Sequence, residues 1–230
     1  ELEDDHRLFG LRRFSIQHPS TREYQYEQTY FDNLRYEGVL APRYRFVEVS
    51  LNGEDLGIYA LEEFFGRELI ESQNRRAGVL LGFEEKYYWE HVGRSPIRRT
   101  RPHSVMGMLT ESFTSLHAYI DVFESGRIAK NPELQSQADI AVLNLRKFQE
   151  GRVIAGDIFD LEKMATFFAV TQLWGAGHAL LENNIRLYYN PVSGLIEPVG
   201  YDGSPDPKVY EQSFAGFQHP AFGIDRKSVV

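Results

Sequence analysis

Apolar residues in the first part of the chain alternate with polar ones, a spacing that is typical of β-strands. Residues 8–17 (LFGLRRFSIQ) predict one strand, and residues 43–51 (RYRFVEVSL) predict a second. Asn52-Gly53 is a strong turn signal, and residues 56–61 (LGIYAL) predict the return strand. The sequence therefore predicts a hairpin that ends at Glu62-Glu63. This acidic pair either lies in solvent at the end of the strand or supplies hydrogen-bond acceptors to a ligand there.

A helix is expected between the first strand and this hairpin. Ser20, followed three residues later by Glu23, forms a capping-box signature. Gly38 is the kind of residue that follows the end of a helix, so we expect the helix to end near it.

A carboxylate falls within the apolar face of this predicted helix. Glu27 stands three residues after Tyr24 and four before Phe31, on the face that also carries Leu34, with Tyr30 beside them. An unpaired buried charge is costly, so an inward Glu27 needs a cation or hydrogen-bond donors. Two interpretations stay open. Glu27 is a structural ion-pair residue at the edge of the stripe, or it is positioned to pair with a Lys or Arg that touches a ligand.

Apolar residues in the second half recur every three or four positions, which predicts helices. Asp160 is placed to cap the third of these helices. After a Gly-rich loop at residues 175–184, two strands are expected at 185–189 and 195–199, and Pro198 indicates that the second lies at a sheet edge or ends early. The three helical stripes consist of Phe113, Leu116, Ile120 and Phe123; of Leu134, Ala138, Ala141, Leu145 and Phe148; and of Leu161, Met164, Ala165 and Phe168.

This order of elements predicts an α+β fold with two lobes. A small lobe of strands and a helix would occupy residues 1–90, a connecting loop residues 91–107, and a mainly helical lobe with a small hairpin residues 108–230. We expect these parts to form one domain, and we interpret the chain as a fragment of a longer protein.

Composition and charge argue against several classes of function and site. The 230 residues carry a formal net charge of −8, which argues against a general nucleic-acid binder, and they include no cysteine, which excludes disulfides and thiolate metal sites. Residues 164–181 carry no formal charge, but their polar and glycine residues favour a buried helix over a membrane span. Positive charge concentrates at Arg94, Arg98, Arg99 and Arg101, which form either a solvated loop or a docking patch for phosphate or an acidic partner.

The segment 178–203 carries the best candidate chemistry, because the GxxxxGK[ST], GxGxxG, HExxH and GxSxG motifs are missing from the sequence. A loop with His178 and Asn183-Asn184 precedes the predicted hairpin, and Asp202-Gly203 follows it. Phosphotransferases of the protein-kinase type use this order, with a catalytic base and an Asn in the loop and a metal-binding Asp after the hairpin. Oxygen ligands suit the hard cations that bridge phosphates.

Three segments resemble the CotH family of atypical, spore-coat-type protein kinases. They are FSIQHPSTREYQYEQ (14–28), GVLAPRYRFVEVSLNGEDLGIYALEE (38–63) and NNIRLYYNPVSGLIEPVGYDGS (183–204). The resemblance implies a divergent, two-lobed, protein-kinase-like fold that uses ATP with Mg²⁺ or Mn²⁺ and phosphorylates serine on protein substrates. It also suggests a bacterial protein of the spore coat or cell surface.

The resemblance implies a set of nucleotide-binding residues. Glu27 would be the ion-pairing glutamate of the helix, with Arg12 or Arg13 on the preceding strand as its partner. Tyr59 would stack on the adenine, and Glu62-Glu63 would lie at the lip of the adenine pocket. The plainer interpretation of Tyr59 is a core aromatic.

The resemblance also implies metal and catalytic positions, with two departures from the family pattern. Asn184 and Asp202 would bind the metal ion, although Asn184 could instead be a turn residue. Ala179 stands where the catalytic Asp is expected, and His178 beside it is the candidate in its place, unless it is a loop histidine bonded to backbone. Gly200 replaces the first acid of the family's Asp-x-Asp. The chain is therefore expected to be an ATP-dependent protein kinase-like domain or, alternatively, a catalytically impaired binding or scaffold domain of a coat or surface protein.

Overall fold

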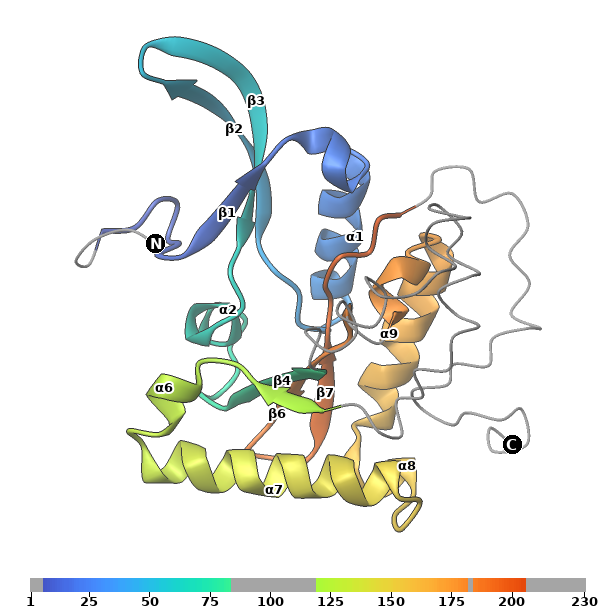
Figure 1. Ribbon diagram of the computed structural model, residues 1–230. Helices are drawn as coiled ribbons and strands as arrows, with labels where there is room; N and C mark the ends of the chain where they lie inside the picture. Colours follow the sequence, from blue (N-terminus) through green and yellow to red (C-terminus); the bar gives the residue numbers. More distant parts are fainter. Residues whose placement is uncertain (1–5, 84–118, 182–183, 206–230) are drawn as a thin grey trace, which may run out of the picture.

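The computed structural model describes residues 6–83, 119–181 and 184–205, and within them the fold is α+β with two small antiparallel sheets and several helices (Figure 1). The first part contains β1 (Phe14–Gln17), the 3₁₀ turn η1 (Pro19–Arg22), α1 (Gln25–Tyr36), β2 (Tyr44–Leu51), β3 (Glu54–Glu63), α2 (Arg67–Ser72) and β4 (Val79–Phe83). The second part contains β5 (Ile120–Val122), α6 (Ser125–Ile128), α7 (Pro132–Gln149), α8 (Ala155–Ile158), α9 (Leu161–Leu173), η3 (Gly177–Leu180), β6 (Arg186–Tyr189) and β7 (Ile196–Val199).

The first sheet has the strand order β1-β3-β2 and contains the predicted hairpin. In Figure 1 the tip of the β2–β3 hairpin extends away from the rest of the molecule. The strand predicted over 8–17 is shorter than expected, because Phe9 and Gly10 take positive φ angles of 53° and 79° and turn the chain before β1 begins. Leu8 and Leu11 pair with each other across that turn.

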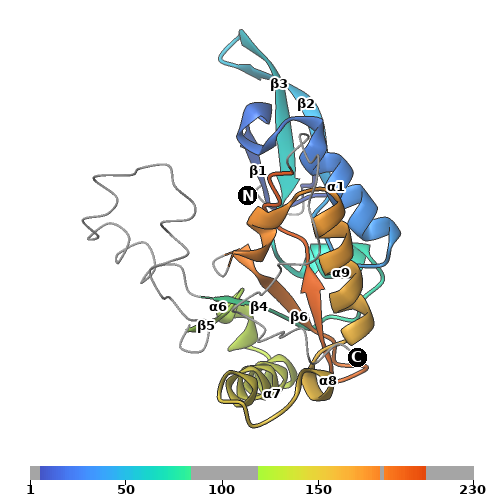
Figure 2. The ribbon, with the colours of Figure 1, turned by 90° about the vertical axis from the view of Figure 1, so that its right-hand side faces the viewer.

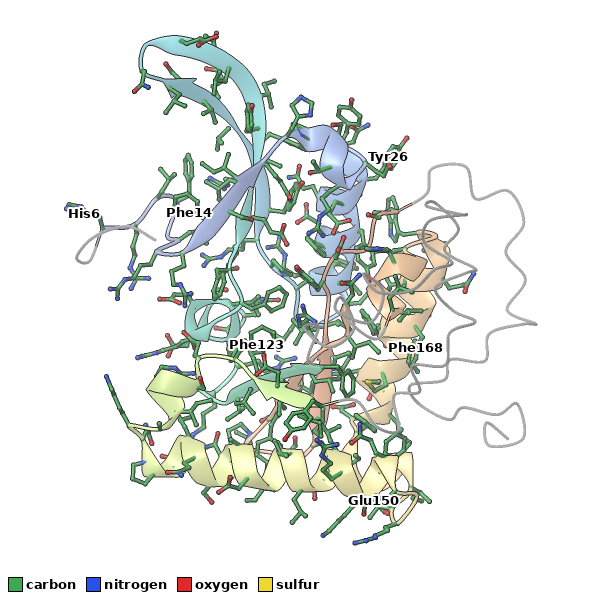
Figure 3. The ribbon with its side chains drawn as sticks, viewed as in Figure 1. His6, Phe14, Tyr26, Phe123, Glu150 and Phe168 are labelled. Atoms are coloured by element: carbon green, nitrogen blue, oxygen red, sulfur yellow. The ribbon has the colours of Figure 1, made fainter. Side chains whose placement is uncertain are left out.

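The second sheet has the strand order β5-β4-β6-β7, and α7 packs against three of these four strands, β4, β5 and β6. β7 is an edge strand, which confirms the prediction made from Pro198. The helix predicted from the Phe113–Phe123 stripe is wrong for residues 120–122, which form β5 and pair with β4. Phe123, labelled in Figure 3, instead packs among Leu69 of α2 and Leu80 of β4. Phe113 and Leu116 lie outside the described residues.

Helices α1 and α9 pack side by side and join the two parts of the structure (Figures 1 and 2). The Tyr30 hydroxyl of α1 lies 2.9 Å from the Thr171 hydroxyl of α9, and both residues are fully buried. The Trp174 indole donates to Asn33 Oδ1 at 2.9 Å. Helix α1 and the C-terminal end of α9 are therefore held together by one buried and one partly buried hydrogen bond as well as by apolar packing.

Local signals predicted the end of α1 and the start of α9, but the start of α1 differs. Asp160 accepts a hydrogen bond from the Lys163 amide and caps α9 as predicted, and Gly38 follows α1 with φ +77°. Ser20 and Glu23 form no capping box, because Glu23 and Tyr24 take positive φ angles and reverse the chain between η1 and α1. Tyr24 is consequently 52% exposed and does not belong to the buried face of α1.

Two parts of the predicted division into lobes can be compared with the described residues. β4, which falls within the predicted first lobe, pairs with β6 of the second sheet. The predicted connecting loop 91–107, with its four arginines, lies outside the described residues. In the part of the chain that the structure describes, no helix is long and apolar enough to cross a membrane.

Candidate functional site

Glu27 is a fully buried carboxylate in the first turn of α1. It accepts hydrogen bonds from the backbone amides of Gly203 at 3.0 Å and Ser204 at 2.9 Å. The segment after β7 runs alongside α1 toward its N-terminal end, which brings these two amides to Glu27 (Figure 1). The inward position predicted from helical spacing is confirmed, and the amides supply donors that the sequence did not reveal.

The cation beside Glu27 is Arg22, the last residue of η1. Its Nη1 lies 3.6 Å from Glu27 Oε1, which confirms that Glu27 pairs with a cation. The expected partners on the preceding strand, Arg12 and Arg13, do not take this position. Arg13 instead lies 3.8 Å from Glu124 and stacks over the ring of Phe64. Arg22 reaches Glu27 because the chain reverses at residues 23 and 24.

Asp202 connects Arg22 to the loop before β6. Its Oδ1 lies 2.6 Å from Arg22 Nη1 and 3.2 Å from His178 Nδ1. Asn184 donates from Nδ2 to the His178 carbonyl oxygen at 3.0 Å, and the same amide nitrogen lies 3.0 Å from His178 Nδ1. Asn184 and Asp202 thus converge on one imidazole nitrogen, as expected for residues at opposite ends of a hairpin. Whether they bind a metal ion stays a prediction.

Burial and charge shift the ionisation of this group of residues. Burial raises the pKa of Glu27 to about 7, although the positive charge of Arg22 opposes the shift. Burial would also raise the pKa of Asp202, but the hydrogen bond from His178 and the charge of Arg22 outweigh it and lower that pKa. The same hydrogen bond raises the pKa of His178. The contact between them thus shifts the pKa of Asp202 downward and the pKa of His178 upward.

The predicted nucleotide-binding residues of β3 lie at different depths. Tyr59 is half-buried, and its ring meets His18 edge-on with the centroids 5.9 Å apart. Glu62 is buried and not at an exposed lip, and its Oε2 accepts from Gln17 at 3.0 Å and lies 4.0 Å from Arg22 Nη2. Glu63 is also buried and is held by Arg43. Glu62 therefore belongs to the same charged group as Arg22, whereas Glu63 does not.

Close packing surrounds the two positions, 179 and 200, where the resemblance implies an acidic residue. A Cβ atom at Gly200 would lie 2.5 Å from Leu34 Cδ1 and 3.2 Å from Ala41 Cβ, so α1 leaves no room for a side chain there. Ala179 is 1% exposed and packs with Tyr30 in an apolar cluster. His178, and not residue 179, faces Asp202.

The donor set around Asp202 is small. Within residues 6–83, 119–181 and 184–205, no three His, Asp or Glu side chains are placed to hold one metal ion. The predicted metal ligands Asp202 and Asn184 both approach His178 Nδ1, Asp202 with a carboxylate oxygen and Asn184 with its amide nitrogen.

Sequence reasoning missed Arg22 and Arg186. Arg22 precedes Glu27 by five positions, which is not a helical neighbour spacing, so only the reversed chain brings the two together. Arg186 is buried on β6 and stacks over the rings of Tyr201 and Phe123, with its guanidinium carbon 4.5 Å and 5.3 Å from the centroids. A positive charge at a buried strand position was the signal that could have identified it.

The chain was compared with known protein families and with curated proteins. A family model described as CotH kinase protein matches residues 5–211, which is most of the chain and includes every site residue named above. No curated protein matches the chain.

Proposed function

Because the chain belongs to the CotH kinase family, we propose that it is a kinase-like domain that binds ATP with Mg²⁺ or Mn²⁺ and transfers phosphate to serine on protein substrates. We further propose a two-lobed, kinase-like arrangement, in which the sheet β1-β3-β2 with α1 forms the smaller lobe. The observation that carries the proposal is the convergence of α1, β3, the loop before β6 and the segment after β7 on Arg22 and Asp202.

Asp202 and Asn184 have side chains of the type that binds divalent cations. Asp202 and Asn184 offer a carboxylate and an amide oxygen, which are the hard ligands that Mg²⁺ and Mn²⁺ prefer. These two residues would hold the ion, which when bound would neutralise the phosphate charge during transfer. Arg22 now contacts Asp202 Oδ1, so this oxygen would have to exchange one cation for another.

The side chains around Asp202 would act mainly by positioning Asp202, the nucleotide and the serine substrate. Glu27 holds the segment that follows Asp202 through two backbone amides, and we propose that this contact helps to position the Asp202 side chain. We propose that His178 orients Asp202 and stands nearest to an incoming serine hydroxyl, and that Tyr59 and Glu62 line the nucleotide. We also propose that Arg13, which directly precedes β1 and lies 3.8 Å from Glu124, contacts the nucleotide.

A nucleotide-binding domain with impaired transfer is the second candidate. It is favoured by the closed position at Gly200 and by the apolar surroundings of Ala179. Loss of one preorganised electrostatic contact typically lowers a rate by about 10²–10³-fold, so we expect slow transfer by this chain.

The test combines binding and transfer. Thermal denaturation with ATP, with and without Mn²⁺, should show a metal-dependent rise in melting temperature for the wild type and a smaller one for Asp202→Ala. Transfer of labelled phosphate to a serine-rich acceptor then separates the two candidates, since binding without transfer supports the impaired domain. An absence of any nucleotide effect on stability would refute both.

A further inference from the structure

One guanidinium group lies within salt-bridge distance of three carboxylates that come from three separate elements. Arg22 Nη1 lies 2.6 Å from Asp202 Oδ1 and 3.6 Å from Glu27 Oε1, and its Nη2 lies 4.0 Å from Glu62 Oε2. The Arg22 side chain is 14% exposed, and Glu27 is fully buried. Other half-buried arginines make simpler pairs, such as Arg75 with Glu197 at 3.1 Å.

The shortest of the three contacts involves the carboxylate that we propose as a metal ligand. A guanidinium at 2.6 Å from Asp202 Oδ1 and a divalent cation require the same oxygen, and they repel each other at that distance. Arg22 also has two further carboxylates within reach, so it can leave Asp202 without becoming an unpaired buried charge.

From this geometry we propose that Arg22 is an internal counter-cation that competes with the divalent metal for Asp202, so that metal binding requires Arg22 to move toward Glu27 and Glu62. The inference rests on the proposed function, because it assumes that Asp202 is a metal ligand. It adds an element of control, since any interaction that draws Arg22 toward Glu27 or Glu62 strengthens metal binding.

The two buried carboxylates are suited to receive Arg22. Burial raises the pKa of both Glu27 and Glu62, which means that each ionised carboxylate lacks sufficient compensation in its present surroundings. A closer guanidinium would stabilise the ionised forms. The cost of removing Arg22 from Asp202 is therefore partly offset at the other two contacts.

The experiment measures Mn²⁺ binding directly, from the electron paramagnetic resonance signal of free Mn²⁺ during titration of the full chain without nucleotide. An opposite charge near a carboxylate changes its affinity for a proton by about 1–3 pKa units. We therefore expect Arg22→Gln to bind Mn²⁺ at least about tenfold more tightly than the wild type. Arg22→Lys keeps the charge and should stay within about threefold of the wild type. Arg75→Gln, which breaks a comparable ion pair elsewhere, should leave the affinity unchanged.

A double variant tests the proposal even if Arg22→Gln alone does not fold. Arg22→Gln leaves Glu27 without its cation, so Arg22→Gln/Glu27→Gln removes the buried charge together with its partner, and Glu27→Gln alone is its control. Circular dichroism verifies that each variant is folded. The double variant should again bind Mn²⁺ at least about tenfold more tightly than its control.

The outcomes separate this inference from the proposed function. If Asp202→Asn abolishes Mn²⁺ binding but both Arg22→Gln variants bind no more tightly than their controls, Asp202 is a metal ligand and the competition is refuted. If Asp202→Asn binds Mn²⁺ as the wild type does, or if neither the wild type nor the Arg22 variants bind it, the proposed metal site and the competition both fail.

Discussion

Replacing Glu27 by glutamine should change how the stability of the protein depends on pH. The carboxyl has an ordinary pKa of 4.5 and a pKa of about 7 in the folded protein. Between these values the folded state holds a proton that the unfolded state has lost, so stability falls as the pH rises from about 4.5 through about 7. The full penalty is about 3 kcal/mol at 1.36 kcal/mol for each pKa unit, and about 2.5 kcal/mol of it arises between pH 5 and pH 8.

Glutamine has the shape of glutamate but no titrating group. At pH 5 the variant should be less stable than the wild type by about 1 kcal/mol. Glu27 accepts hydrogen bonds from two backbone amides, and in the variant one of these amides would face the glutamine NH₂ group and lose its acceptor. Urea unfolding at pH 5 and pH 8 should nevertheless show that Glu27→Gln loses about 2.5 kcal/mol less stability over this range than the wild type does. Glu48→Gln, at an exposed position of β2, is the matched control and should follow the wild-type profile. Parallel profiles for the wild type and Glu27→Gln would refute the assignment of a raised pKa to this buried carboxyl.

Three further predictions concern the residues around Asp202. Gly200→Asp should destabilise the fold by about 1–3 kcal/mol through overpacking against Leu34. In a double-mutant cycle measured by urea unfolding, Gly200→Asp should cost less in the Leu34→Ala background than in the wild type. Asp202→Asn should lower the pKa of His178, followed by NMR titration of the imidazole, since the carboxylate is what raises it; an unchanged pKa would contradict the contact. Phosphate transfer by this chain should be slow and should disappear in Asp202→Ala, whereas fast transfer that survives the substitution would show that the catalytic residues are misplaced.

Sequence patterns predicted the elements whose signals are local. The β2–β3 hairpin follows from alternation around Asn52-Gly53, and α9 begins where Asp160 caps it. β4 and β5 were not predicted. β4 (VLLGF) is buried along its whole length and therefore shows no alternation, and Ile120 of β5 happens to stand at helical spacing from preceding apolar residues. Their pairing joins residues far apart in sequence, so no local pattern could reveal it.

In the candidate site, too, only the features with a local sequence signal could be predicted. Helical spacing predicted that Glu27 points inward, and the hairpin predicted that Asn184 and Asp202 meet. The identity of the cation did not follow, because Arg22 reaches Glu27 only through the positive φ angles at Glu23 and Tyr24. Such angles are uncommon for residues other than glycine, and neither residue type indicates them in the sequence.

Helix α1 packs against the segment 200–204, which contains Gly200 and Asp202. Leu34 fills the space that a side chain at position 200 would need, and the Gly200 amide donates to the Leu40 carbonyl oxygen at 2.7 Å just beyond the end of α1. Two and a half turns earlier on the same helix, Glu27 holds the amides of Gly203 and Ser204. The segment from 200 to 204 is therefore held at Gly200 by Leu40, which follows α1, and at Gly203 and Ser204 by Glu27 of α1, with Asp202 between these contacts. An acid introduced at position 200 would clash with Leu34, and we expect the displaced segment to disturb the contacts of Glu27 as well, so Gly200→Asp should not add a second carboxylate beside Asp202 without a loss of stability.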